Sequence, residues 1–396
     1  MAPTLTVLDS LGALSARRDA WNDLWKHADA TSPAGRAETI ALWVRQFADG
    51  QPFRALVAEA DGRFVAALPL VGRRVAPGLS VGSLPGNEWS PAGELLVRRD
   101  AAGPDHLGPR AEAALATLAG GLGQLPWPVL WAEGVPVEAA RWRTFVALAG
   151  GRRLPAHERP SYETVRVATT GSFEAYFDGL ARSHQRNIRR AVRRLADVGT
   201  LRLRIEQGLA PEEVAPLLAA GLAIEDRNWK GRGGTSVLRT PGMTEFYTAQ
   251  AESLAAAGQL VLVFLELDRV PIAFEYAWRA KGVHHSFKIG YDEAFARQSP
   301  GQVRTYLLLE HLFDDPSMHM MDFMGPMAYS GEVWKTDTYR VGKLAIAARP
   351  VTGAALVWGY GQVWPRVRSW LGRPGGQDGT SPVNADSADE PTAASA

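Results

Sequence analysis

Cysteine is missing from the 396-residue sequence. Its absence excludes disulfide bonds, a cysteine nucleophile and thiolate metal ligands, and it fits a cytoplasmic protein, which is the location that we expect. An excess of charge of one sign is also missing, because 43 Lys and Arg residues face 42 Asp and Glu residues. The net charge of +1 gives no general reason to expect nucleic acid or an acidic membrane as a partner.

Long apolar runs and several enzyme signatures are also absent. No run reaches the roughly 20 apolar residues that span a bilayer, and the nearest candidate, AALVWGYGQVW, predicts a packed or interfacial helix. The N-terminal residues lack a basic start followed by an apolar core, so no signal peptide is expected. The sequence has no G-x-S-x-G, HExxH or Walker A motif, and no G-x-G-x-x-G motif after a strand, which disfavours hydrolases, metalloproteases, NTPases and dehydrogenases.

The sequence does contain two similar segments. Residues 50–70 and 258–276 each combine Gly-Gln, an apolar strand, a turn and a second apolar strand. The turns fall at Asp61-Gly62 and at Asp268-Arg269. The separation of the segments, close to half of the ordered chain, indicates a tandem duplication of one α/β unit. At 46% apolar residues, the chain is a globular protein large enough for two domains.

These patterns predict four regions. We expect an N-terminal domain at 1–165, a C-terminal domain at 166–350 and a helix within 351–373. Residues 374–396 are small, polar and Pro-containing, which is typical of a disordered tail. The first half has no short strand-turn-helix segment after its hairpin, so we expect a functional loop of that kind in the second half only.

That loop lies in the segment YDEAFARQSPGQVRTYLLLEHLF, which reads as a strand end, a Ser-Pro-Gly turn and a Leu-rich helix. The backbone N–H groups of Gly301, Gln302 and Val303 then stand at a helix N-terminus, without intrahelical partners and at the positive end of the helix dipole. We predict that this loop, with Gln298 and Ser299, binds a phosphate or pyrophosphate. Pro followed by Gly at a helix start is also ordinary helix punctuation.

The segment ARSHQRNIRRAVRRL predicts an amphipathic helix with six arginines. Arg186, Arg189 and Arg193 fall on one stripe, and Ile188 and Leu195 lie on the opposite, apolar face. A solvated helix face is one interpretation. Mutual repulsion of six cations favours the other, an anionic substrate such as a CoA phosphate, a lipid head group or a nucleic acid. Nucleic acid is disfavoured because aromatic residues do not interleave with the arginines.

Trp229 and Lys230 stand beside a glycine-rich stretch, EDRNWKGRGG. They suit an acceptor pocket, with Trp229 as its wall and Lys230 as the contact to an anion or a carbonyl. An ordinary helix end, with Trp229 packed into the core, explains the same residues equally well.

Candidate bases lie on two predicted strands. His284 and His285 are adjacent and therefore point to opposite faces, so they cannot share one metal ion, and we predict no metal site. His285 is a candidate base because imidazole titrates near neutral pH, although a packed strand histidine is the alternative. Glu275 competes for this role, since desolvation beside an apolar cleft would raise the pKa of its carboxyl group.

Two further residues follow in the segment MHMMDFMGPMAYSG. Asp322 interrupts an apolar strand and needs a partner, so it is either a structural hydrogen-bond acceptor or part of the active site. Tyr329 lies just beyond that strand, where it could protonate a departing thiolate. Both are candidate catalytic residues.

Taken together, these segments resemble the CelD-like branch of the GNAT acyltransferase superfamily, which is related in fold to FemAB-type transferases. The resemblance rests on the basic helix, the Trp-Lys pair, the hairpin LVFLELDRVPIAFEYAW, the 291–313 segment and MDFMGPMAYSGEVWKTD. The spacing Gln298-x-x-Gly301-x-Val303 is similar to the Q/R-x-x-G-x-G/A loop that holds the pyrophosphate of acyl-CoA, with Val in place of the last small residue. The resemblance to the family is clearest from about residue 172 to 345.

The resemblance implies an α/β (α+β) fold of tandem GNAT-like domains, each a mixed twisted sheet flanked by helices. It also implies transfer of an acyl group, most simply acetyl, from acyl-CoA as co-substrate. The strand backbone at Ile289–Tyr291 would then polarise the thioester carbonyl. Family members often place an acidic residue and a Tyr-Lys pair where this sequence has Pro326 and Tyr329-Ser330.

That departure leaves the identity of the acceptor open. The acceptor would be an amine or hydroxyl on a small molecule, a sugar or a lipid-linked compound. The resemblance also suggests a role in envelope or polysaccharide metabolism, with peripheral contact at the inner membrane face. Two alternatives also remain. One is a FemAB-like transferase that uses aminoacyl-tRNA, and the other is a non-catalytic binding module that keeps the fold.

Overall fold

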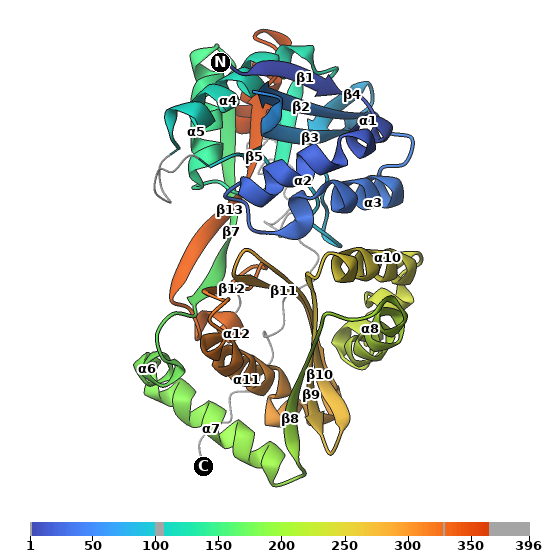
Figure 1. Cartoon of the computed structure of the whole chain (residues 1–396), viewed down its shortest axis with the longest axis vertical. Helices are drawn as coiled ribbons and strands as arrows, with labels where there is room; N and C mark the ends of the chain where they lie inside the picture. Colours follow the sequence, from blue (N-terminus) through green and yellow to red (C-terminus); the bar gives the residue numbers. More distant parts are fainter. Residues whose placement is uncertain (1, 100–106, 328, 364–396) are drawn as a thin grey trace. The chain divides into compact units, whose positions relative to one another are not determined.

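The computed structural model describes residues 2–99, 107–327 and 329–363, which form a mixed α/β fold (Figure 1). The chain divides into two compact units. It passes from the first to the second between Tyr162 and Glu163 and returns to the first between Tyr339 and Arg340. Both crossings lie within strands, β7 (Ala156–Ala168) and β13 (Asp337–Ala347).

The N-terminal unit has the strand order β1-β2-β3-β4-β6-β13, and β5 pairs with β3. The β4–β6 pair is parallel, and the other pairs that carry a register are antiparallel. Its strands are β1 (Thr4–Leu8), β2 (Phe53–Ala60), β3 (Arg63–Ala76), β4 (Leu79–Ser83), β5 (Leu96–Val97) and β6 (Val129–Pro136). Its helices are α1 (Leu11–Ala16), α2 (Arg18–His27), η1 (Pro33–Gly35), α3 (Ala37–Phe47), α4 (Pro109–Gly121), η2 (Leu122–Gln124), α5 (Ala140–Gly151), α13 (Thr352–Trp358) and η5 (Gly359–Val363).

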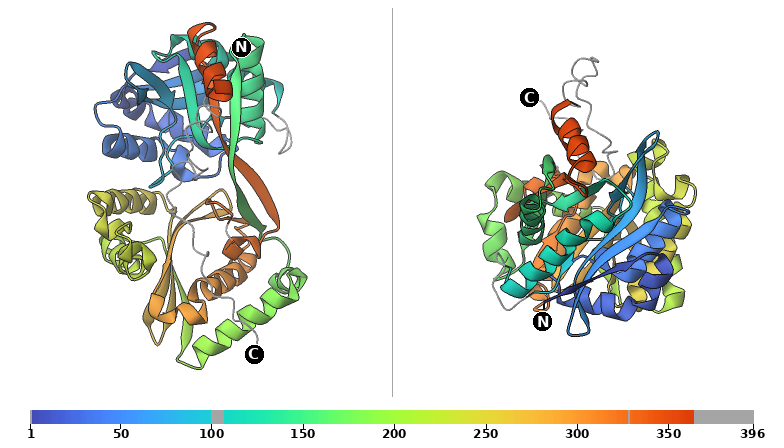
Figure 2. Two further views of the ribbon diagram at one scale, coloured as in Figure 1. Left: turned by 180° about the vertical axis from the view of Figure 1, so that it is seen from behind. Right: turned by 90° about the horizontal axis from the view of Figure 1, so that it is seen from above.

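The C-terminal unit has the strand order β7-β12-β11-β10-β9-β8. Helices α8 and α10 cover one face of its sheet, and α7 and α11 lie on the other (Figures 1 and 2). Its strands are β8 (Leu201–Gln207), β9 (Leu260–Leu267), β10 (Val270–Ala280), β11 (Val283–Tyr291) and β12 (Met320–Asp322). Its helices are α6 (Phe173–Gly179), α7 (Arg182–Ala196), α8 (Pro211–Asp226), α9 (Trp229–Arg232), η3 (Val237–Arg239), α10 (Met243–Ala256), η4 (Glu293–Gln298), α11 (Pro300–Asp314) and α12 (Tyr329–Glu332).

The two units share one topology. In each unit, four antiparallel strands are followed in the sheet by a fifth strand, β6 or β12, that is parallel to the fourth. The sixth strand, β13 or β7, pairs antiparallel with the fifth. The predicted hairpins are β2–β3 and β9–β10, and both turns hold left-handed residues, with φ of 51° and 73° at Asp61 and Gly62 and 49° and 68° at Asp268 and Arg269. This repeated order supports the duplication, and the predicted mixed α/β fold is confirmed.

The division into units differs from the predicted regions at the return crossing. We expected the C-terminal domain to run to residue 350, but β13 pairs with β6 from Val341 onward and so joins the N-terminal unit. Within the predicted 351–373 helix, α13 and η5 are the described part. The predicted tail, 374–396, lies outside the described residues.

The connection after the fourth strand distinguishes the units. In the C-terminal unit only η4 separates β11 from α11, whereas in the N-terminal unit the long connection from β4 to α4 contains β5. The short strand-to-helix loop that the sequence indicates therefore occurs after β11 and not after β4.

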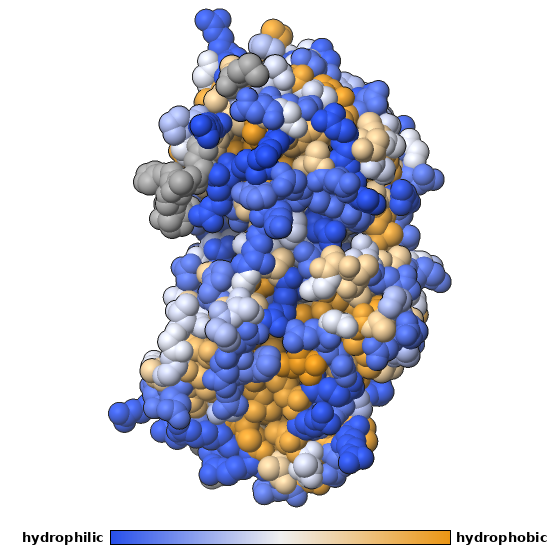
Figure 3. Space-filling view, viewed as in Figure 1, coloured by the Kyte–Doolittle hydropathy of each residue, from blue (hydrophilic) through white to orange (hydrophobic). Residues whose placement is uncertain are grey.

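Apolar side chains hold α7 and α11 against the sheet of the C-terminal unit. All eight residues of β9 are buried, and Leu308, Leu309 and Leu312 of α11 pack with β9 and β10 residues in one apolar cluster. Figure 3 shows apolar side chains gathered in the lower half of the view, where Figure 1 draws this unit. No helix among the described residues has the length and hydropathy needed to cross a membrane.

Candidate functional site at strand β11 and helix α11

Strand β11 is paired on both sides over only part of its length. It pairs with β10 throughout, but with β12 only from Val283 to His285. Its register against β10 also shifts, since Tyr276 opposes Lys288 and Ala277 opposes Ser286, which leaves Phe287 as a β-bulge. From Ser286 to Tyr291, no described strand pairs with the far edge of β11, so this half of the strand forms an edge of the kind to which a further backbone or ligand can pair.

The predicted phosphate loop follows this open edge. Ser299 adopts a left-handed conformation, with φ of 50° and ψ of 53°, and Pro300 begins α11. The Ser299 carbonyl accepts hydrogen bonds from the N–H groups of Gln302, at 3.1 Å, and Val303, at 3.2 Å. We expected three backbone amides without intrahelical partners, and this expectation is corrected. The Gln302 and Val303 amides both donate to the Ser299 carbonyl, whereas the Gly301 amide does not.

Gly301 has open space around it. A Cβ atom built on Gly301 would meet only the Tyr291 ring, at an ordinary 3.8 Å. Packing within the protein therefore does not require glycine here, although glycine lowers helix stability relative to alanine. The side-chain Oε1 of the nearby Gln298 is buried without a hydrogen-bond partner in the described part of the chain. The fold thus brings three predicted ligand-binding residues, Gln298, Gly301 and Tyr291, into one region.

A buried ion network ties α11 to the sheet. Glu275 on β10 contacts Arg304 of α11 at 3.0 Å and the His284 Nε2 atom at 2.7 Å, and all three side chains are at most 3% exposed. Arg304 also donates a 3.0 Å hydrogen bond to the Phe274 carbonyl. Burial alone would raise the pKa of Glu275, but Arg304 and then His284 outweigh it and hold the pKa below its ordinary value. The raised pKa expected for Glu275 is therefore wrong, because the sequence did not reveal these partners.

The opposite face of β11 carries a second buried polar cluster. Lys230 on α9 donates from Nζ to the Ile289 carbonyl at 3.0 Å and lies 3.6 Å from a Glu225 carboxylate oxygen. Its Nζ is 6.0 Å from the centre of the Trp229 ring. Lys230 is 3% exposed, so it is a core residue that contacts the open strand and not a surface residue beside a loop.

Lys288 belongs to the same cluster and was missed at the level of sequence. It is 2% exposed, and its Nζ lies 5.0 Å from the centre of the Tyr247 ring. Burial lowers the pKa of Lys288 to about 8, with Glu225 raising it and Lys230 lowering it. The available signal was a lysine within the apolar strand VHHSFKIGY.

His285 and Asp322 meet where β11 and β12 pair. They oppose each other in the parallel ladder, and both are buried. Asp322 accepts hydrogen bonds from the Met324 N–H, the Tyr339 hydroxyl and the Arg166 guanidinium, at 2.8, 3.2 and 3.3 Å. Burial raises the pKa of Asp322 although Arg166 opposes this. Of its two predicted roles, these contacts favour the structural one.

The segment after β12 also reaches α11. Trp334 is fully buried and donates from Nε1 to the Gln302 side-chain oxygen at 2.9 Å. Tyr329 begins α12, and its side chain lies outside the described part of the structure. The structure thus places this segment beside the predicted loop through Gln302.

The arginines of α7 are all exposed, while Ile188 and Leu195 on the opposite face are buried. The helix packs against α11 and η4. Arg189 lies 3.5 Å from Asp178, and Arg194 donates to the Arg297 carbonyl in η4 at 3.4 Å. The predicted anion-binding arginines therefore belong to a helix that contacts the loop leading into α11.

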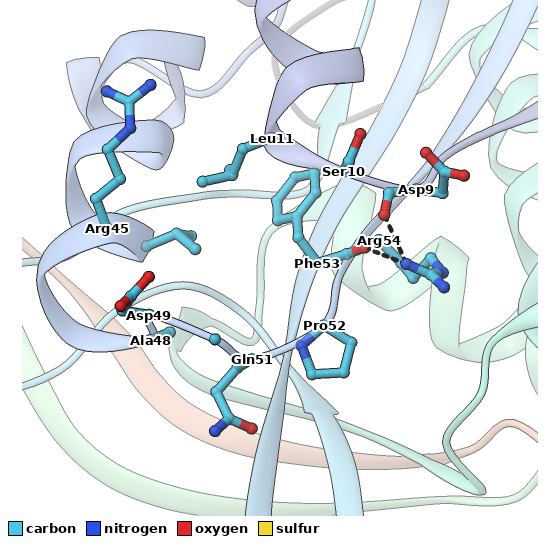
Figure 4. A pocket seen from close by; sticks show the side chains of 12 residues that line it. Asp9, Ser10, Leu11, Arg45, Ala48, Asp49, Gln51, Pro52, Phe53 and Arg54 are labelled. Carbon is cyan, nitrogen blue, oxygen red and sulfur yellow. Dashed lines mark hydrogen bonds between the residues drawn. The ribbon is translucent and has the colours of Figure 1, made fainter.

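A separate pocket lies in the N-terminal unit (Figure 4). Its volume is about 260 Å³, and it is lined by residues 9–11, 44–45 and 48–54. Arg54 donates to the carbonyls of Asp9 and Phe53, at 2.6 and 2.7 Å, so the backbone engages its guanidinium. None of the predicted site residues lines this pocket. In the described ranges, no group of three or more His, Asp or Glu side chains suits a metal ion.

Comparison with known families gives a match to part of the C-terminal unit. Residues 182–336 match the family model described as an acetyltransferase (GNAT) domain. The matched range holds α7, β11, the Ser-Pro-Gly loop and α11. The search of curated proteins finds no match to the sequence.

Solved structures show the same fold across both units. FemX is similar with a TM-score of 0.58 and 10% identity, over 87% of this chain and 98% of that chain. A conserved Bacteroides thetaiotaomicron protein of unknown function has a TM-score of 0.55 and 10% identity, over 86% of this chain and 100% of that chain. The C-terminal domain of a putative lysylphosphatidylglycerol synthetase from Agrobacterium fabrum has a TM-score of 0.50 and 11% identity, over 87% of this chain and 95% of that chain.

Proposed function

Because residues 182–336 match a GNAT acetyltransferase domain, we propose that this protein transfers an acyl group, most simply acetyl, from acyl-CoA to an amine or hydroxyl acceptor. The observation that carries this proposal is the open edge of β11 next to Gly301, a glycine that internal packing does not require. Such a position suits close approach of a ligand to the backbone.

In this proposal, the loop at 298–303 and the arginine helix α7 both bind the acyl-CoA donor. The Gly301 amide and the positive end of the α11 dipole face the pyrophosphate, and the Gln298 side-chain NH₂ group and the Ser299 hydroxyl donate further hydrogen bonds to it. With Gln302 and Val303 amides already bonded, further positive charge is needed. The exposed arginines of α7, including Arg186 and Arg193, supply it to the anionic parts of the substrates.

The thioester lies along the open edge of β11 in this proposal. Backbone N–H groups between Ile289 and Tyr291 polarise its carbonyl as charge develops on oxygen. The Lys230 contact to the Ile289 carbonyl and the Arg304 contact to the Phe274 carbonyl hold the strand and the helix in place. Glu275 is thus a positioning residue, since it anchors Arg304. Tyr329 protonates the departing thiolate.

Acyl-CoA binding tests the donor site directly. Isothermal titration calorimetry with acetyl-CoA should show binding to the wild-type chain, and Gly301→Glu should reduce the affinity at least tenfold because a carboxylate would enter the phosphate position. Gly150→Glu is the matched control, since Gly150 lies in α5 with no atom within 4 Å of a built Cβ. Equal affinity of the two variants, or no binding by wild type, would refute the donor site. Release of free CoA with a panel of acyl-CoAs and amines separates an enzyme from a binding module.

An aminoacyl-tRNA donor is the second candidate. It is favoured by the six exposed arginines of α7 and by the fold that this chain shares with FemX across both units. An RNA partner would make affinity fall steeply with salt, because binding to phosphates releases counterions. A shallow salt dependence, together with measurable acetyl-CoA binding, would exclude this candidate.

A further inference from the structure

The buried cluster on the α8 face of β11 contains more basic than acidic side chains. Four elements place titratable groups around Lys288: Glu225 from α8, Lys230 from α9, Tyr247 from α10 and Tyr276 from β10. Glu225 also accepts a hydrogen bond from the Val237 N–H at 3.2 Å. Among these groups a single carboxylate therefore faces two lysines.

The carboxylate acts on both lysines, since it lies beside Lys230 and also raises the pKa of Lys288. Lys230 lies 3.6 Å from Glu225 and donates to the Ile289 carbonyl, both contacts that suit an ammonium group. A second buried ammonium beside them is disfavoured by desolvation and by repulsion from the first. Burial accordingly lowers the pKa of Lys288 to about 8, so roughly a tenth of Lys288 is a neutral amine at pH 7 and half of it at pH 8.

The position of Lys288 is as important as its charge. It directly follows the bulge at Phe287 and lies in the part of β11 that no longer pairs with β12. The alternation of side chains puts Lys288, His285 and Tyr276 on one face. Glu275 and His284 lie on the other face, where Arg304 engages the carboxylate. Lys288 thus belongs to the strand segment at which the thioester carbonyl is proposed to lie, and its side chain extends from that segment towards α10.

We propose that Lys288 is the catalytic base that removes a proton from the acceptor amine. This inference rests on the proposed acyl transfer and assigns to Lys288 the role that the sequence suggested for Glu275 or His285. The acceptor nitrogen forms a bond to the thioester carbonyl carbon, and the C=O electron pair moves to oxygen. The Lys288 amine takes the N–H proton, the C–S bond breaks, and the thiolate departs and is protonated, which gives an amide and free CoA.

Two substitutions at one position separate a base from a simple cation. Lys288→Gln removes both charge and basicity, whereas Lys288→Arg keeps the charge but cannot release its proton at these pH values. Both should lower kcat for acyl transfer at least about 10²-fold, as expected for loss of a general base. Acetyl-CoA affinity, measured by calorimetry, should stay within about threefold of wild type, because the loop and α11 are unchanged. Lys26→Gln, on an exposed position of α2, is the control.

The pH profile adds a readout that a structural role would not affect. Wild-type kcat/KM should rise with pH through an apparent pKa near 8, because only neutral Lys288 accepts a proton. Glu225 raises the pKa of Lys288, so Glu225→Gln should move this acidic limb to lower pH.

The outcomes are distinct. Wild-type activity in Lys288→Arg, or an acidic limb that persists in Lys288→Gln, would overturn the role of Lys288 while leaving acyl transfer intact. Absence of both acetyl-CoA binding and transfer in wild type would overturn the proposed function itself, and this inference with it.

Discussion

The Lys230 side chain reaches from α9 to the Ile289 carbonyl on β11, at 3.0 Å, and this contact joins two residues that are far apart in the sequence. Lys230 was expected to contact an anion or a carbonyl, and Ile289 was expected to border the thioester. The contact involves the half of β11 that no β12 residue pairs with. Lys230 therefore supplies a partner to a buried strand carbonyl that a neighbouring strand would otherwise satisfy.

Loss of this contact should destabilise the protein. Lys230→Met removes the donor to the Ile289 carbonyl and one of the two lysines beside the Glu225 carboxylate, and we expect a cost of about 1–3 kcal/mol in the free energy of unfolding. Urea denaturation measures it. Lys335→Met is the control, because Lys335 is 42% exposed and forms an exposed pair with its sequence neighbour Glu332, and such a change should stay within about 0.5 kcal/mol. Equal stability of the two variants would contradict the assigned contact.

The ion pair between Glu275 and Arg304 predicts strong coupling. Arg304→Met leaves a buried carboxylate that keeps His284 and Ser286 as partners but loses its guanidinium partner, with an expected cost of about 3–5 kcal/mol. The double variant Glu275→Leu/Arg304→Met removes both charges and should recover much of that loss. A double-mutant cycle, with Glu275→Leu as the other single variant, measures the interaction. Additive effects would show that the two side chains do not form a pair.

The pH dependence of stability should reflect the lowered pKa of Glu275. Its ionised form is stabilised in the fold, so its contribution is present above the ordinary glutamate pKa of about 4.3 and is lost as pH falls through the lower folded value. The stability difference between wild type and Glu275→Gln should therefore shrink on acidification. Denaturation at several pH values measures this difference, and a constant difference would contradict the network.

Asp322 should behave in the opposite sense. Burial raises the pKa of Asp322, so the stability that its protonated form contributes is present below the ordinary aspartate value of about 3.9 and is lost as pH rises through the folded value. The stability of wild type relative to Asp322→Asn should fall as pH rises through that window. A rise would show that Arg166 dominates over burial.

The arginine helix should influence binding more than stability. In the triple variant Arg186→Glu/Arg189→Glu/Arg193→Glu, exposed cations are replaced by anions beside the donor loop, and acetyl-CoA affinity should drop at least tenfold at low salt. Calorimetry at two salt concentrations measures the effect, which should narrow as salt increases.

A control variant with the same change in net charge, made far from α7 in the sequence, tests whether the position of the arginines determines the loss of affinity. Three exposed arginines of the N-terminal unit serve this purpose, in the variant Arg63→Glu/Arg74→Glu/Arg152→Glu. Its affinity for acetyl-CoA should remain near that of wild type. Similar losses in both triple variants would assign the effect to net charge and not to α7.

Local patterns determined a large part of this protein. The strand VHHSFKIGY, the Ser-Pro-Gly helix start and the arginine helix all follow from short-range rules, namely alternation, helix-start residues and amphipathic spacing. The two hairpins followed from their turn residues. Gln298, Gly301 and Tyr291 could be predicted as neighbours because they lie within one strand-to-helix connection.

Partners that are distant in the sequence could not be predicted in this way. Glu275 has the same local pattern whether its carboxylate faces a cleft or Arg304, and its pKa changes direction between the two. Lys288 looks like a surface lysine until α8 and α10 cover it.

The sequence by itself determined the two hairpins, the short strand-to-helix loop after β11 and the charged face of α7, because each depends on residues close together in the chain. Tertiary structure decided which titratable groups are buried together, that Glu275 is engaged in an ion pair and that Lys288 has a lowered pKa. The physical reason is that pKa values and ion pairs depend on desolvation and on charges within a few ångströms, and packing of distant elements sets both.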